Sequence, residues 1–201
     1  MNAVEIANLA LTYLGENTIT ALDSDESPTA ATMALLYPVR KEAGLKSWPW
    51  KFATKTVDLS AEVATPTNDR YTSQYVMPAD FVAMIETDLP GEDYEFETAS
   101  DETLRLLSTR DTITIRYVAD VAADKFPIDF VQALAYDLAA NAALAIQGEA
   151  GANKAPIWQQ QASNAWARAK AQDGGSAPAR IRSMDAGLLM GRDEGLFRGP
   201  Q

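Results

Sequence analysis

Acidic side chains are the residues of this chain that come nearest to a catalytic arrangement. The sequence of 201 residues contains no cysteine and no histidine, which excludes thiolate nucleophiles, serine–histidine relays and the usual zinc sites. A glycosidase needs two carboxyl groups across a cleft, one of them with a raised pKa. The acidic candidates, most of them in turn-rich segments, are Glu16, Glu92, Asp93, Glu95, Asp101 and Glu102. Because carboxylates in turns are ordinarily solvated, we expect no catalytic residue and no enzyme.

Motifs for metals and nucleotides are incomplete. A calcium loop that began at Asp23 would need glycine where Pro28 stands and glutamate where Ala34 stands. Gly174 and Gly175 lack the lysine and the strand–loop–helix context of a phosphate-binding loop. We therefore expect no metal site and no cofactor.

The excess of acidic over basic residues argues against a nucleic-acid-binding protein. Asp and Glu total 28 against 17 Lys and Arg, for a net charge of −11, whereas proteins that hold DNA ordinarily carry a basic surface. No run of apolar residues is long enough to cross a membrane. The first ten residues lack the basic and apolar blocks of a signal peptide, so we expect synthesis in the cytoplasm.

The stretch WPWKFAT (48–54) concentrates aromatic residues at one point of the chain. Pro49 fixes its own φ and biases Trp48 toward extended backbone, which favours the end of a helix here. Trp48, Trp50 and Phe52 can then bury large areas between neighbouring elements. The alternative is a platform on which bases or sugars stack, but only Lys46 and Lys51 supply basic neighbours. We expect Trp48, Pro49, Trp50 and Phe52 to form a structural anchor.

Hydrophobic periodicity places helices at both ends of the chain and strands between them. The predicted helices span 2–14, 28–45, 128–147 and 156–171, with a kink or break at Pro38 and a loop over 148–156. The predicted strands span 52–59, 71–77, 81–87, 94–98, 103–108 and 112–118.

This order predicts an α+β fold in which the N- and C-terminal helical pairs form a four-helix bundle. Residues 1–47 and 126–171 would build the bundle, and residues 48–125 an inserted β-rich lobe. Residues 172–201 are rich in glycine, proline and mixed charge, so we expect a flexible tail that orders on assembly. Its predicted docking groups are Arg180, Arg182, Leu188, Leu189, Arg192, Phe197 and Arg198.

Several segments, taken in order, resemble the head-to-tail adaptors of short-tailed phages, the tail tubular protein A family. They are LTYLGENTITAL (11–22), the alanine-rich second helix, LKSWPWKFATKTVDL (45–59), YVMPADFVAMI (75–85) and FPIDFVQALAYDLAANAA (126–143). These segments carry the family's LGE opening, its PW.FA junction, its P.D strand turn and its P..F..A helix start. The resemblance covers about residues 1–171 and leaves out the tail.

The resemblance implies a structural protein of the virion. Adaptors of this family form a ring, a dodecamer in known members, beneath the portal protein, where they extend the DNA channel and carry the tail nozzle protein. By this resemblance the bundle would build the ring wall, the β-rich lobe would face the nozzle, and the C-terminal segment would reach toward the portal. Double-stranded DNA would pass the ring during ejection without specific binding.

Two other functions stay open at this stage. Some relatives of the family have been assigned peptidoglycan hydrolysis, which here would use a pair of the carboxylates named above. The second possibility is a general α+β scaffold or binding module with no connection to a phage.

Overall fold

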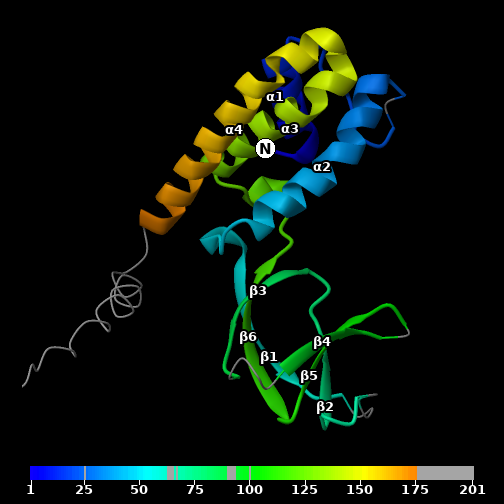
Figure 1. Cartoon of the computed structure of the whole chain (residues 1–201), viewed down its shortest axis with the longest axis vertical. Coiled ribbons are helices and arrows are strands. Elements are labelled where there is room, and N and C mark those ends of the chain that lie inside the picture. The colour runs from blue at the N-terminus through cyan, green and yellow to red at the C-terminus, as the bar shows by residue number, and fades with distance from the viewer. Residues whose placement is uncertain (25, 63–65, 67, 90–93, 100, 176–201) are drawn as a thin grey trace, which may run out of the picture.

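In Figure 1 the helical part of the chain lies above the strand part. The structure, a computed structural model, describes residues 1–24, 26–62, 66, 68–89, 94–99 and 101–175. Within these ranges, two α-helices precede the strands in sequence and two follow them, and the strands form two small antiparallel sheets. This confirms the predicted α+β class.

The first helix, α1 (Ala3–Leu14), begins and ends at residues with clear capping roles. The Asn2 side chain accepts a hydrogen bond from the Glu5 N–H, and the Glu5 carboxylate accepts one from the Asn2 N–H. Gly15 ends the helix with φ at 77°, a left-handed conformation that suits glycine. One face of the helix is buried through Ile6, Ala7, Ala10, Leu11 and Leu14.

The second helix, α2 (Pro28–Lys46), is longer than its internal proline suggests. The Ser27 hydroxyl accepts from the Ala30 N–H at 3.2 Å, and Pro28 occupies the first helical position. The helix passes through Pro38 without interruption, so a break there is wrong. Pro38 is exposed, and it deprives only the Ala34 carbonyl of a hydrogen bond inside a helix that packs on α3.

The third and fourth helices, α3 (Ile128–Gln147) and α4 (Glu149–Gly175), are separated by Gly148 alone. The predicted loop over 148–156 is therefore wrong. A Cβ atom on Gly151 would lie 1.9 Å from the carbonyl oxygen of Ala143, so only glycine permits this close approach of the two helices. Tight packing thus overrides the loop signals of Gly148, Gly151 and Pro156.

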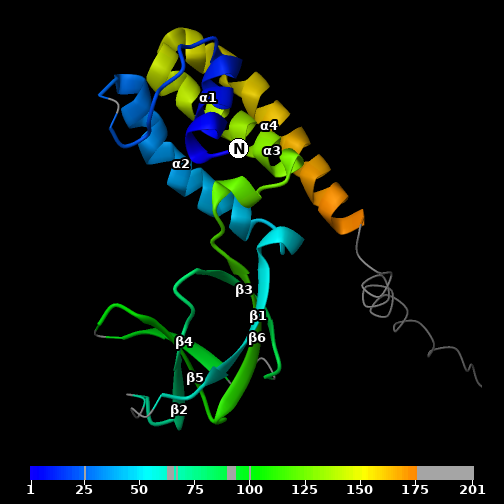
Figure 2. The ribbon, with the colours of Figure 1, turned by 180° about the vertical axis from the view of Figure 1, so that it is seen from behind.

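Helix α3 is the centre of the helical part, because it packs against α1, α2 and α4. Its buried face is rich in alanine, whose small side chains let the neighbouring helices approach closely. Figure 2, the view from behind, brings α1 in front of α4. Among the described residues, none of the helices has the length and apolar character that a bilayer crossing requires.

The strands form two three-stranded antiparallel sheets. One has the order β1 (Thr54–Ser60), β6 (Thr112–Ala119), β3 (Phe81–Thr87), and the other β2 (Ser73–Val76), β5 (Leu104–Ser108), β4 (Tyr94–Thr98). The predicted strands agree within two residues at each end. Strands β1 and β2 each begin two residues later than predicted, in β1 because Lys51–Ala53 form a 3₁₀ turn.

Two hydrophobic clusters lie inside the molecule. The larger one joins the helices, and it also takes in Trp50 and Ala53 from the segment before β1 and Val118 from β6. The smaller one lies in the strand part around Tyr75 and Ile115. The helical core therefore extends past residue 47 into the predicted lobe.

Candidate functional site

The two tryptophans of WPWKFAT have different environments. Trp50 is 1% exposed, and its indole N–H donates a hydrogen bond to the Gly44 carbonyl at 2.9 Å. Trp48 is 37% exposed, and its indole N–H donates to the Asp173 carboxylate at 3.1 Å. The burial that we expected of both indoles therefore applies to Trp50 alone.

Trp50 belongs to an aromatic cluster that joins the junction to the last two helices. Its ring meets Phe130 of α3 edge-on, with centroids 5.1 Å apart, and lies 6.0 Å from the ring of Trp166 in α4. Phe52 packs against Phe130 at 5.1 Å. Edge-to-face pairs add to the burial of apolar area. The cluster fixes the direction in which the chain leaves α2.

Asp173 ties the end of α4 to the same junction. Its carboxylate accepts from the Trp48 indole and from the backbone N–H of Lys51 at 3.1 Å. We predicted a flexible tail from residue 172, but residues 172–175 form the last turn of α4. The predicted docking residues Arg180, Arg182, Leu188, Leu189, Arg192, Phe197 and Arg198 lie outside the described residues.

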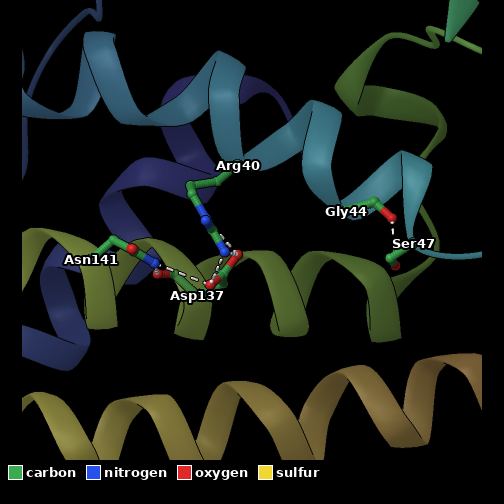
Figure 3. Close-up of polar contacts among 5 residues, drawn as sticks. All are labelled: Arg40, Gly44, Ser47, Asp137 and Asn141. Atoms are coloured by element: carbon green, nitrogen blue, oxygen red, sulfur yellow. Dashed lines mark hydrogen bonds and ion pairs between the residues drawn. The ribbon is translucent and has the colours of Figure 1, made fainter.

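A bidentate ion pair links α2 to α3 (Figure 3). The Arg40 guanidinium donates through Nε to one oxygen of Asp137 at 2.8 Å, and through Nη2 to the other at 2.7 Å. Asn141 donates its side-chain amide to the Asp137 carboxylate at 3.1 Å and to the Asp137 carbonyl at 2.7 Å. The Asp137 side chain is only 10% exposed, so its carboxylate is largely shielded from water, whereas the Arg40 side chain is 31% exposed.

A groove lies beside this ion pair, between α2, α3 and α4. Its volume is about 450 Å³. We call it the helix groove; it is lined by Arg40, Ala43, Gly44, Ser47, Asp137, Ser163, Trp166, Ala167 and Lys170. Gly44 is required at its floor, because a Cβ atom there would lie 2.6 Å from the Trp166 ring. The groove therefore combines an indole and small side chains with two cationic groups and two hydroxyls.

A second cavity, of about 380 Å³, lies between α2 and the start of β3. We call it the junction cleft; its polar lining residues are Tyr37, Lys41, Glu42, Asp80 and Asp120. Lys41 pairs with Asp120 at 2.5 Å, which joins α2 to the end of β6. Asp80 pairs with Lys55 at 2.5 Å and accepts from the Tyr117 hydroxyl at 2.9 Å. The Lys41–Asp120 pair therefore joins the strand part to α2, while the contacts of Asp80 lie within the strand part.

Two residues that line the junction cleft, Tyr37 and Asp80, and the neighbouring Tyr117 have shifted pKa values. Burial raises the pKa of Tyr37 to about 12, and the Asp120 carboxylate adds to this effect. Burial also raises the pKa of Tyr117 to about 12, helped by its hydrogen bond to Asp80. The hydrogen bond from Lys55 lowers the pKa of Asp80. The Tyr37 hydroxyl is buried and makes no hydrogen bond to any described residue.

The candidate carboxylates in the described part of the chain lie at three separate places, with Asp101 and Glu102 together in one turn. Glu16 accepts a hydrogen bond from Gln147 at 3.0 Å, and Glu95 one from Asn68 at 3.4 Å. Asp101 caps a turn, where the Thr103 hydroxyl holds the pKa of its carboxyl below the ordinary value. Glu102 follows in that turn at a φ of 64°. Glu92 and Asp93 lie outside the described residues.

A general acid needs a raised pKa, and that of Asp101 is lowered. In the described part of the chain, no group of three or more acidic side chains is placed to hold a metal ion.

The helix groove was missed by sequence reasoning. Arg40 and Asp137 are 97 positions apart, and each stands in a helix where a solvated charge is the ordinary expectation. A partial signal was present, because Asp137 interrupts the alanine-rich apolar face of α3. A buried carboxylate at such a position needs a cationic partner.

Comparison of the sequence with protein-family models and with curated proteins finds no match.

Proposed function

We propose that this chain is a structural head-to-tail connector of a tailed phage, an adaptor that assembles as a ring under the portal. The ring extends the DNA channel and provides the platform for the tail nozzle. Its four helices act as a bundle that forms the ring wall, and the β-rich lobe faces the nozzle. Residues 176–201 carry the docking groups for the portal and neighbouring subunits.

The observation that carries the proposal is the pairing of the resembling motifs in space. Trp50 of the PW.FA junction packs edge-on against Phe130 of the P..F..A helix start. Asp80 of the P.D turn pairs with Lys55, just after the junction. Gln147, at the end of α3, donates to Glu16 of the LGE opening. Motifs that are distant in sequence thus stabilise one another, which supports a resemblance of the whole arrangement.

Exposed apolar side chains on the helices support a role in assembly. Large apolar residues that face solvent include Leu35, Val39, Ile128, Leu144 and Ile157. Leu35 and Val39 are one helical turn apart on α2, on the side away from its buried face. An exposed apolar pair such as Leu35 and Val39 could contact another subunit. A net charge of −11 suits a conduit through which DNA slides without sticking.

Truncation tests the proposal. The full chain should sediment with a purified portal ring, and the variant that ends at Gly175 should remain folded but no longer sediment with it. The truncation keeps every described helix and strand, since α4 ends at Gly175, so the variant should retain the helical circular dichroism signal. Unchanged binding of the truncated chain to the portal would contradict the assigned role of residues 176–201. Absence of any binding by the full chain would contradict the connector function.

A further inference from the structure

The helix groove presents hydrogen-bond donors that the chain itself does not use. The ion pair with Asp137 engages Nε and Nη2 of Arg40, and it leaves Nη1 without a partner among the described contacts. The Arg40 side chain lines the groove and is 31% exposed. Ser163 lies across the groove on α4.

The guanidinium is held in place before any ligand arrives. Asn141 fixes the Asp137 carboxylate, and the carboxylate grips Arg40 with two bonds (Figure 3). A donor that is already oriented loses less entropy when it binds an anion. Its free edge therefore suits a carboxylate, which matches a guanidinium in geometry.

Lys170 makes the groove positive. In the described part of the chain, no carboxylate lies within ion-pair distance of its amine, and the one carboxylate that lines the groove, Asp137, is taken by Arg40. Two cations face one anion here in a protein whose net charge is −11. The lining of Trp166, Ala43 and Ala167 can meanwhile cover the apolar stem of an incoming side chain.

We infer that the helix groove binds a carboxylate side chain from the strand part of a second copy of this chain. The strand part is the complementary surface, because the described residues between positions 48 and 125 include 13 acidic against 7 basic side chains. A groove on one part of a subunit that meets a different part of the next is a head-to-tail contact, and such contacts close into rings or grow into filaments. The inference rests on the proposed ring and names the contact that would build it.

Zero-length cross-linking tests this contact directly. The full chain, as an equal mixture of ¹⁴N and ¹⁵N protein at low ionic strength, is treated with a carbodiimide that joins amines to touching carboxylates. Mass spectrometry should find isotopically mixed peptides that connect Lys170 with an acidic residue between positions 48 and 125. Cross-links of Lys170 that stay within one isotope, or none at all, would overturn the inference.

Charge reversal at Lys170 provides a second test. Lys170→Glu should weaken self-association at least about tenfold in sedimentation equilibrium, because it places like charges in contact. Lys154→Glu, on the same helix outside the groove, should associate as the wild type does. Equal self-association of the Lys170→Glu and Lys154→Glu variants would overturn the inference. The inference would also be overturned if Lys170→Glu lost only binding to a DNA duplex, because the groove would then bind phosphate. Portal binding is scored separately: a Lys170→Glu chain that still forms full rings on the portal refutes this contact and leaves the connector function standing.

Discussion

The carbonyl oxygen of Gly44 accepts the indole N–H of Trp50 at 2.9 Å, while the same glycine lies beneath the ring of Trp166. One residue of α2 therefore holds the junction through its backbone and accommodates α4 through its missing side chain. The aromatic cluster depends on both properties.

Gly44→Ala should destabilise the protein by roughly 1–2 kcal/mol, although alanine favours a helix. The new Cβ atom would lie 2.6 Å from the Trp166 ring, which Trp50 and Phe130 hold on its other sides. Urea unfolding, followed by tryptophan fluorescence, measures the change. Gly174→Ala is the matched control, because its Cβ atom would meet nothing closer than 3.7 Å, and it should be neutral or slightly stabilising. A Gly44→Ala protein as stable as the wild type would mean that Trp166 can move aside freely.

Trp50→Phe and Trp48→Phe should differ clearly. Trp50 is buried and its indole is hydrogen-bonded, so the smaller ring leaves a void and the loss should be about 2–3 kcal/mol. Trp48 is exposed, and its replacement removes only a solvent-accessible bond to Asp173, for a loss of at most about 1 kcal/mol. Denaturation curves of the two variants provide the comparison. Equal losses would show that the two indoles share the anchoring role.

Much of the fold could be predicted because local signals agree with tertiary structure. The α+β class, the N-cap at Ser27 and strands β3 and β4 follow from periodicity and from capping residues. The start of α4 could not be predicted, because Gly148, Gly151 and Pro156 resemble a loop until α3 is in place against them. The sequence also gives no sign that six strands divide between two sheets.

The acid stability of the junction should depend on Asp80. Its pKa is lowered in the folded chain by the hydrogen bond from Lys55, so the folded state favours the carboxylate more than the unfolded state does. This stabilisation is present above the unfolded pKa of about 4 and is lost as the pH falls through the lower folded value. Unfolding free energies at pH 6 and pH 3 should therefore differ less in Asp80→Asn than in the wild type. Lys55→Gln should behave in the same direction, and an unchanged difference in both variants would contradict the assignment.

Tyr37→Phe and Tyr117→Phe should move stability in opposite directions. The buried Tyr37 hydroxyl has no hydrogen-bond partner among the residues that the structure describes, so its removal should leave the protein as stable or up to about 1 kcal/mol more stable. Removal of the Tyr117 hydroxyl breaks its bond to Asp80 and should cost about 1 kcal/mol.

Both tyrosines have a pKa of about 12, above the unfolded value of 10, so each contributes stability that declines as the pH rises from 10 toward 12. Absorbance titration should show these two phenols ionising last. Ionisation of all tyrosines near pH 10 in the folded protein would contradict this environment.

The candidate site was only partly visible in the sequence. Aromatic crowding at 48–54 pointed to the junction, since large rings close together seldom lack a packing role. The helix groove depends on Arg40, Asp137 and Lys170, which come from three helices, and no spacing rule connects them. Asp173 was assigned to the tail by composition, and its bonds to the junction become evident only when α4 is seen to continue to Gly175.

The most direct test of the connector function is electron microscopy of the full chain mixed with a purified portal ring. The account predicts an added ring of many copies, coaxial with the portal and open along its axis, with the helical parts forming the wall. Particles that show a bare portal, with the chain left as free monomers at any ratio, would contradict it.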